Sequence, residues 1–189
     1  GRSAFYKCGS AASVALEDTD SDIFYIPIDV EYIGDYAFYS CGYSERASIE
    51  DEQYYNNYGI DMIVISGSVK YIGANAFANF VSLKSVYLGG TEAIGEKAFY
   101  KCESLTTVDF GDSLKSIGNK AFYRCSALTS VTLPATLTEV GSYAFYRCES
   151  IATLDLGGAT TIGSFAFYGN VGLNRLVLPE SVTFIGKQA

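Results

Sequence analysis

Five cysteines are the residues whose type and spacing first suggest chemistry, because thiols bind metals, form disulfides and act as nucleophiles. Each follows a phenylalanine by three residues, and two further copies of this position hold Phe80 and Asn170. The cysteines are Cys8, Cys41, Cys102, Cys125 and Cys148. Interchange with phenylalanine and asparagine favours a buried ladder of reduced thiols, since stacked repeats point such side chains in parallel and a disulfide needs converging Cβ vectors. A zinc site and disulfides remain as alternatives.

Recognisable catalytic motifs are missing from the sequence. The chain of 189 residues has no histidine, which is the commonest general acid or base and the commonest metal ligand. It also has no Gly-x-Ser-x-Gly elbow, no phosphate-binding loop and no Cys-x-x-Cys pair. Carboxylate pairs for glycosidase-like chemistry stay open, but nothing in the sequence places two of them at the mouth of a pocket. We therefore expect that this chain is not an enzyme.

A short acidic segment suggests a calcium site. Asp18, Asp20 and Asp22 alternate as carboxylates do at the start of an EF-hand loop. However, Ile23 stands where that loop needs its turning glycine, and Asp29 stands where a bidentate glutamate is expected. We favour a solvated acidic loop, keep calcium as the alternative, and expect no cofactor.

A segment rich in tyrosine and asparagine is the first candidate binding site. It contains Tyr54, Tyr55, Asn56, Asn57 and Tyr58. Tyrosine with asparagine is typical of adaptable binding surfaces, because the ring supplies area with few rotors and a polar tip. The alternative is that these tyrosines pack the segment back onto the rest of the protein.

The charge balance narrows the class of partner. Thirteen basic and 21 acidic residues give a net charge of −8. Phosphate contacts dominate affinity for nucleic acid, so the charge argues against DNA or RNA and against an anionic membrane surface. No run approaches the ~18 consecutive apolar residues of a membrane-spanning helix, so we expect no direct membrane insertion.

An internal repeat positions these residues. The hexamer Ile-Gly-x-x-Ala-Phe, with a valine variant, places phenylalanines at Phe5, Phe38, Phe77, Phe99, Phe122, Phe145 and Phe167. From Phe77 onward the spacings are 22, 23, 23 and 22. A block Leu-x-x-Val-x-Leu follows, as in Leu128, Val131 and Leu133, and comparable blocks run to Leu173, Leu176 and Leu178. Alternation of apolar and variable residues predicts one short strand for each block.

Such units are too small to bury their own apolar residues, so the repeat predicts a stacked solenoid with a continuous core. We expect parallel strands about 4.8 Å apart, joined by helical or irregular turns. Ala-Phe-x-x-Cys predicts one helical turn. The repeat glycine predicts a backbone conformation, or a close approach, that a Cβ would obstruct.

Two insertions interrupt the repeat at the same phase, about residues 9–22 and 42–57. Both enter between the cysteine position and the strand, so both should project from one edge, where binding loops of repeat proteins often lie. The outward strand position forms a second candidate site: Tyr25, Val64, Tyr87, Asp109, Thr132, Asp155 and Val177. A plain solvated sheet face is its alternative. Lys101, Arg124 and Arg147 form a short basic stripe that fits either an acidic partner or a solubilising role.

The pattern Leu-x-x-Val-x-Leu-Pro-x-x-Leu-x-x-Ile-Gly-x-x-Ala-Phe-x-x-Cys resembles the BspA-type, or Treponema-type, leucine-rich repeats, and this resemblance covers nearly the whole chain. It implies a leucine-rich-repeat solenoid of about 23 residues per turn at residues 1–189. The resemblance also implies a secreted or cell-surface location and adhesion to host or partner cells.

The sequence therefore favours a non-catalytic module that binds a protein or glycan on a host or neighbouring cell. A structural spacer without a ligand of its own is the alternative, although a pure spacer has no reason to interrupt its repeat twice. Because both ends stop inside a repeat, we expect a longer array, or ends that pack on another copy.

Overall fold

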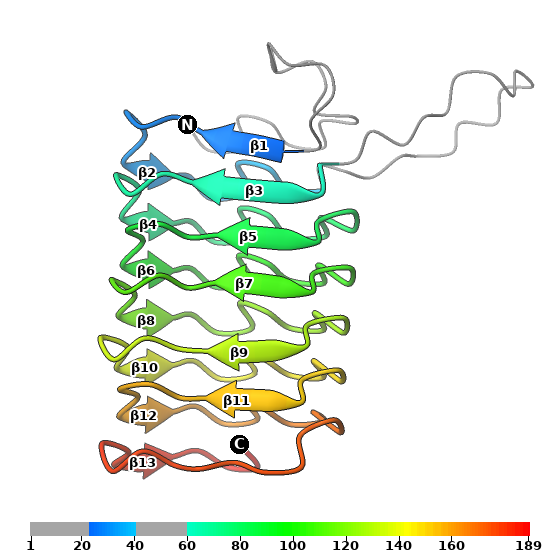
Figure 1. Ribbon diagram of the computed structural model, residues 1–189, viewed down its shortest axis with the longest axis vertical. Coiled ribbons are helices and arrows are strands. Elements are labelled where there is room, and N and C mark those ends of the chain that lie inside the picture. The colour runs from blue at the N-terminus through cyan, green and yellow to red at the C-terminus, as the bar shows by residue number, and fades with distance from the viewer. Residues whose placement is uncertain (1–22, 41–59) are drawn as a thin grey trace, which may run out of the picture.

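The computed structural model describes residues 23–40 and 60–189. From β1 to β12 the strands alternate along the chain between two stacks, and the pairings within each stack are parallel (Figure 1). The odd-numbered strands of the first stack are β1 (Ile23–Ile26), β3 (Met62–Ile65), β5 (Ser85–Tyr87), β7 (Thr107–Asp109), β9 (Ser130–Thr132) and β11 (Thr153–Asp155). The second stack holds the two-residue strands β2 (Tyr32–Ile33), β4 (Tyr71–Ile72), β6 (Ala93–Ile94), β8 (Ser116–Ile117), β10 (Glu139–Val140), β12 (Thr161–Ile162) and β13 (Phe184–Ile185).

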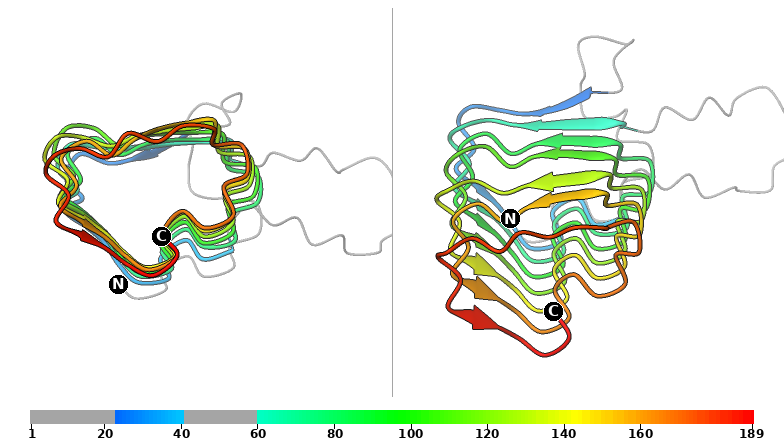
Figure 2. Two further views of the ribbon diagram at one scale, coloured as in Figure 1. Left: turned by 90° about the horizontal axis from the view of Figure 1, so that it is seen from below. Right: turned by 60° about the horizontal axis from the view of Figure 1, so that its bottom comes forward.

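The chain winds as a solenoid, so that each turn lies directly over the previous one when seen along the stack (Figure 2). The short strands form one seven-stranded sheet in the order β13-β12-β10-β8-β6-β4-β2. The longer strands form a four-stranded sheet, β1-β3-β5-β7, and a two-stranded sheet, β11-β9. The predicted leucine-rich-repeat solenoid is confirmed.

Alternation along each odd strand sets what is buried. The central residues Val86, Val108 and Val131 point inward and are buried, while residues on either side are partly or fully exposed. The register places each repeat position beside the same position of the next coil, so Val86 pairs with Val108 and Tyr87 pairs with Asp109. Period-2 burial is the behaviour expected of a strand with one face on the core.

A stack of phenylalanines forms the centre of the core. Neighbouring rings from Phe38 to Phe167 are nearly parallel, with centroids 5.1 to 5.4 Å apart. Phe110 meets two rings of this stack edge-on, Phe122 at 5.6 Å and Phe145 at 6.3 Å. Aromatic pairs in these geometries contribute about 0.5–1.5 kcal/mol each beyond the burial of their area, so the stack joins every turn to the next.

The segment that carries each phenylalanine is not helical, and the predicted helical turn is wrong. Residues 95–98 and 99–102 form two successive turns, in which the fourth amide donates to the first carbonyl at 3.3 and 3.4 Å. The third residues, Lys97 and Lys101, have φ of 57° and 56°, as the third residue of a type II turn does. The alternate amides of Lys97, Phe99 and Lys101 donate instead to the next coil, as Phe99 does to Ala121 at 2.8 Å. Hydrogen bonds between coils thus take the place of a helix.

The repeat glycine is explained by close approach. An added Cβ at Gly118 would lie 2.7 Å from the carbonyl carbon of Gly95 and 2.8 Å from the amide of Glu96. Gly141 faces the same obstruction from Gly118, at 2.7 Å. Neither residue has a left-handed φ, so the missing side chain allows two backbones to meet and does not supply an unusual conformation.

The last strand block differs from the prediction. The segment 173–178 forms no strand. Leu176 is 41% exposed, whereas Val131 at the matching position is buried, and Leu178 is 47% exposed, whereas Leu133 and Leu156 at its matching position are buried. No strand pairing joins this segment to β11. Among the described residues it has a neighbouring coil on one side only, so it lacks part of the cover that an interior coil receives. In the described part of the chain, no helix has the length and apolar character needed to cross a membrane.

Candidate binding surfaces

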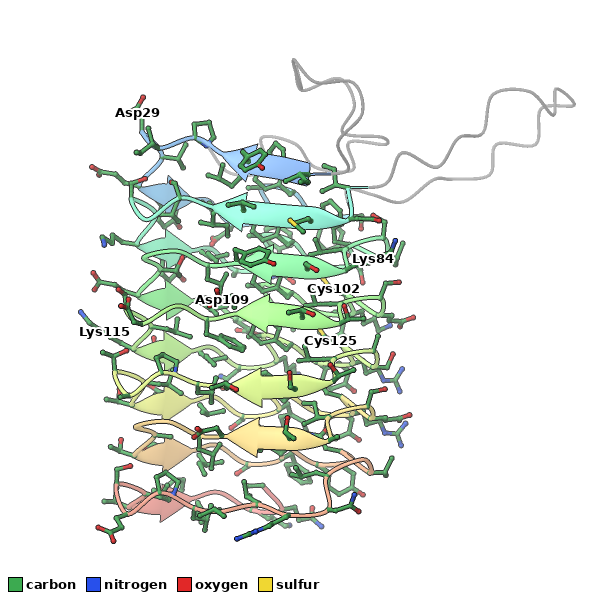
Figure 3. All side chains as sticks on the ribbon, viewed as in Figure 1. Asp29, Lys84, Cys102, Asp109, Lys115 and Cys125 are labelled. Atoms are coloured by element: carbon green, nitrogen blue, oxygen red, sulfur yellow. The ribbon has the colours of Figure 1, made fainter. Side chains whose placement is uncertain are left out.

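The outward column on the odd strands lies as predicted. Register places Tyr25 beside Val64, Val64 beside Tyr87 and Tyr87 beside Asp109. Tyr25 and Tyr87 are 59% and 39% exposed, and Asp109 points outward from β7 in Figure 3. No strand pairing joins β7 to β9, so the column continues in a second in-register group. That group is Thr132 and Asp155, both exposed.

The two aspartates of this column also stabilise turns, which the sequence pattern did not predict. The Asp109 carboxylate accepts a hydrogen bond from the Gly111 amide at 3.0 Å, and Asp155 does the same with Gly157 at 2.9 Å. Both glycines have positive φ, 62° and 55°. The aspartates thus close the turn after their strand as Asx turns do, and each retains one carboxylate oxygen for a ligand. Asp-x-Gly directly after a strand was the available signal.

Two groups of candidates lie outside the described residues. They are the tyrosine and asparagine segment Tyr54, Tyr55, Asn56, Asn57 and Tyr58, and the calcium candidates Asp18, Asp20 and Asp22. The strands that follow the two insertions, β1 and β3, are paired, with Ile23 beside Met62. Both insertions therefore join the solenoid at the same end of adjacent strands. Within residues 23–40 and 60–189, no group of three or more potential ligands could hold a metal ion.

The described cysteines form the expected ladder of buried, free thiols: Cys102, Cys125 and Cys148. Each Sγ donates to a backbone carbonyl of the preceding coil, for example Cys102 to Phe77 at 3.2 Å. Burial raises the pKa of Cys102 and of Cys148 to about 12, and burial beside the other two thiols raises that of Cys125. Thiols that stay protonated are poor nucleophiles and poor ligands, so these residues pack the interior (Figure 3).

A second ladder lies on the third side of the solenoid, where the turns after the even strands stack. This tyrosine ladder consists of Tyr100, Tyr123, Tyr146 and Tyr168, with ring centroids 5.0, 4.9 and 5.4 Å apart. Its rings are partly exposed. The charged group of a basic side chain lies 5.6 to 5.8 Å from the centroid of three of these rings: Lys101 at Tyr100, Arg124 at Tyr123 and Arg147 at Tyr146. Sequence periodicity predicted the packed rings; the cation contacts follow from side-chain conformation.

Four other described lysines form salt bridges: Lys70, Lys84, Lys97 and Lys115. Glu92 receives Lys115 at 2.6 Å and Lys70 at 3.8 Å, and Lys84 pairs with Asp61. The hydrogen bond from Lys115 lowers the pKa of Glu92. Lys115 and Lys84 lie at opposite ends of the odd strands in Figure 3. These exposed pairs add little stability, so their lysines can be replaced without harm to the fold.

Comparison with known proteins identifies the repeat. The family described as BspA type leucine rich repeat region matches in six copies over residues 1–91, 47–155 and 92–189. No curated protein resembles the chain closely enough to count as a match.

Two solved structures share both fold and sequence with the chain. A leucine-rich cell surface protein from Faecalibacterium prausnitzii is 31% identical over 89% of this chain, with a TM-score of 0.73. The T. pallidum leucine-rich repeat protein is 29% identical over 88%, with a TM-score of 0.72. The chain spans 44% of the first of these proteins and 73% of the second. With repeat, register and family match in agreement, the chain belongs to the BspA-type leucine-rich repeat family.

Proposed function

We propose that this chain is a non-catalytic interaction module of a surface or secreted protein, which binds a protein or glycan during adhesion. Recognition would use the outward column of the odd strands together with the tyrosine-rich insertion at residues 42–57. Within the described residues, no group of three or more potential ligands could hold a metal ion, and the three described cysteines are buried.

The observation that carries the proposal is the open face of the odd strands. No described element packs over it (Figures 1 and 2). Tyr25 and Tyr87 stand on it in line with Val64, and in the sequence the tyrosine-rich insertion precedes β3. A rigid, in-register face with exposed tyrosines resembles the binding surfaces of proteins that recognise partners through aromatic anchors.

The surface location is supported by a relative. The Faecalibacterium prausnitzii structure is that of a leucine-rich cell surface protein, and we extend that location to this chain. Leucine-rich repeats of this family in bacterial surface proteins present repeated, rigid faces, which suit contact with large ligands.

The test is a binding screen of the 189-residue chain against extracellular matrix proteins, mucins and a glycan array. Two variants accompany it: one in which the insertion is shortened to the uninterrupted repeat length, and Tyr25→Ser/Tyr87→Ser. The control is Tyr32→Ser, which removes an exposed tyrosine from the sheet of short strands.

We expect a ligand whose binding falls in the two site variants and is kept in the control. Equal loss in all three would contradict the assigned face. Failure of the chain to bind any protein or glycan would instead favour a structural spacer, a role that the continuous stack of phenylalanines also suits.

A further inference from the structure

The third side of the solenoid carries aromatic rings and cations that the proposed function does not use. The tyrosine ladder is flanked by a second column, in which Tyr143 stacks on Phe165 at 4.8 Å and Lys120 lies 5.6 Å from the Tyr143 ring centroid. The two columns touch, since Tyr143 and Tyr146 are 5.6 Å apart. We call this surface the aromatic–cation face: Tyr100, Tyr123, Tyr143, Tyr146, Phe165 and Tyr168 with Lys101, Lys120, Arg124 and Arg147.

The four cations of this face have no partner of opposite charge among residues 23–40 and 60–189. No described carboxylate forms a salt bridge with any of them, whereas neighbouring Lys97 is paired with Glu96 at 3.3 Å. They therefore form a local positive field on a chain whose net charge is −8. Contact with an aromatic ring holds a cation in place without using its hydrogen-bond donors. The N–H groups of these side chains therefore remain available to a ligand.

The backbone gives an independent reason to assign the cations a task. Lys101, Arg124 and Arg147 occupy a turn position with φ of 56°, 58° and 52°. Glycine or asparagine is favoured in this conformation, and they do occur at the same position in the flanking coils, as Asn79 and Gly169. Three long basic residues in succession cost conformational energy that the core does not require.

The tyrosine ladder is also presented for contact. Its ring faces cover one another, so the ladder offers ring edges and hydroxyl groups to solvent. These four hydroxyls have no partner among the described residues and are not buried. A row of hydroxyls with adjacent cations repeats at the ~4.8 Å interval of stacked strands.

The period of this row and its small number of cations argue against two other classes of acidic ligand. An extended acidic peptide places same-side carboxylates about 6.6 Å apart, out of step with the row, and duplex DNA carries a charge about every 1.7 Å, which needs more cations than four. A polysaccharide with an anion on successive sugars presents carboxylate or sulfate groups to the guanidinium groups, which bind both in a bidentate manner. Its hydroxyls match the tyrosine hydroxyls.

We propose that the aromatic–cation face binds an acidic polysaccharide laid along the solenoid axis, with Lys101, Arg124 and Arg147 on its carboxylate or sulfate groups and the tyrosine ladder on its sugar hydroxyls. Each coil adds one weak contact, and affinity accumulates along the chain of sugars. Because this face and the outward column of the odd strands lie on different sides, the two proposals can fail separately.

The experiment measures binding of the 189-residue chain to immobilised polygalacturonate, chondroitin sulfate, dextran and polyglutamate by biolayer interferometry at low salt. The test variant is Lys101→Gln/Arg124→Gln/Arg147→Gln. The matched control, Lys70→Gln/Lys84→Gln/Lys115→Gln, removes three positive charges from the other two sides. A third variant, Tyr123→Phe/Tyr146→Phe, keeps the stack and removes two hydroxyls. Circular dichroism verifies that all variants fold.

We expect binding to at least one of the two acidic polysaccharides and none to dextran, with about tenfold loss in the test variant and less than about twofold loss in the control. Binding to polygalacturonate shows that carboxylates suffice, because this polymer carries no sulfate, and preference for chondroitin sulfate shows that sulfate adds to the affinity. Absence of binding to both, equal loss in the control, or equal binding to polyglutamate would overturn the proposal. Unchanged affinity of the tyrosine variant would remove the ladder from the site.

Discussion

Replacement of Gly118 by alanine tests the claim that adjacent coils meet backbone to backbone. The new Cβ would lie 2.7 to 2.9 Å from three backbone atoms of the preceding coil, in Gly95, Glu96 and Ile94. Since none of these atoms belongs to a flexible side chain, the coils must separate. Overpacking of this kind costs about 1–3 kcal/mol, and the 2.8 Å hydrogen bond from Gly118 to Ile94 would lengthen at a further cost of about 1 kcal/mol.

We therefore expect the Gly118→Ala variant to be about 2–4 kcal/mol less stable. The assay is urea unfolding followed by far-UV circular dichroism and by tyrosine fluorescence, because the chain has no tryptophan. With a slope near 2 kcal/mol per molar urea, the midpoint should fall by about 1–2 M. Two probes are needed because solenoids can unfold locally beside a damaged coil.

The matched control is Gly67→Ala. An added Cβ there meets only the amide nitrogen of Gly90, at 3.9 Å, an ordinary contact distance. This variant should be unchanged or up to about 1 kcal/mol more stable, because alanine restricts the unfolded chain. A Gly118→Ala protein within about 0.5 kcal/mol of the wild type would refute the close-approach explanation of the repeat glycine.

Three further predictions concern the turns and the thiols. Lys97 has φ of 57°, so Lys97→Gly should stabilise the protein by up to about 1 kcal/mol and Lys97→Val should destabilise it by about 1–2 kcal/mol in the same urea titration; the reverse order would exclude a strained turn. Cys102, Cys125 and Cys148 are buried, so dithionitrobenzoate should not label them in the folded protein and should label all three in urea, in a variant whose other two cysteines are serine; fast labelling of folded protein would contradict a buried ladder. Burial raises the pKa of Cys102 and Cys148 to about 12, so their stabilising effect is complete below the unfolded pKa of about 8.5 and is lost as the pH rises from there toward 12. By about pH 10, each thiol should lower the free energy of unfolding by on the order of 1–2 kcal/mol. Urea midpoints should therefore fall more steeply from about pH 8 to 10 in the wild type than in Cys102→Ala/Cys148→Ala. Parallel profiles would show that the two thiols do not control this pH dependence.

Features that depend on phase alone could be predicted from the sequence. The phenylalanine stack follows from a spacing of 22 or 23 residues, because a fixed phase in a solenoid is a fixed place in space. The same argument predicted the outward column through Tyr87 and Asp109 and the burial of Cys125. Register needs no information beyond the repeat, so these predictions required only the right period.

Features that depend on local backbone energy were not predicted. Ala-Phe-x-x-Cys has apolar residues at a spacing that suits a helical turn, and lysine at position 97 or 101 gives no sign of a left-handed φ. The conformation is set by hydrogen bonds to the next coil, such as Lys101 to Tyr123 at 2.8 Å. These bonds outweigh a strain of about 1–2 kcal/mol per residue, and a sequence pattern does not display that balance.

The same balance explains why surface residues of this solenoid give evidence about a ligand, whereas core residues give evidence about the fold alone. Interior positions repeat because each must cover its copy in the next coil, so Phe122 reports the fold and says nothing about a ligand. Position 124 is under no such constraint: asparagine and glycine fill it at Asn79 and Gly169, with less strain than arginine. Residues that are costly for the backbone and unnecessary for the core are the ones whose side chains must be explained by contact with something else. Lys101, Arg124 and Arg147 of the aromatic–cation face are three such residues.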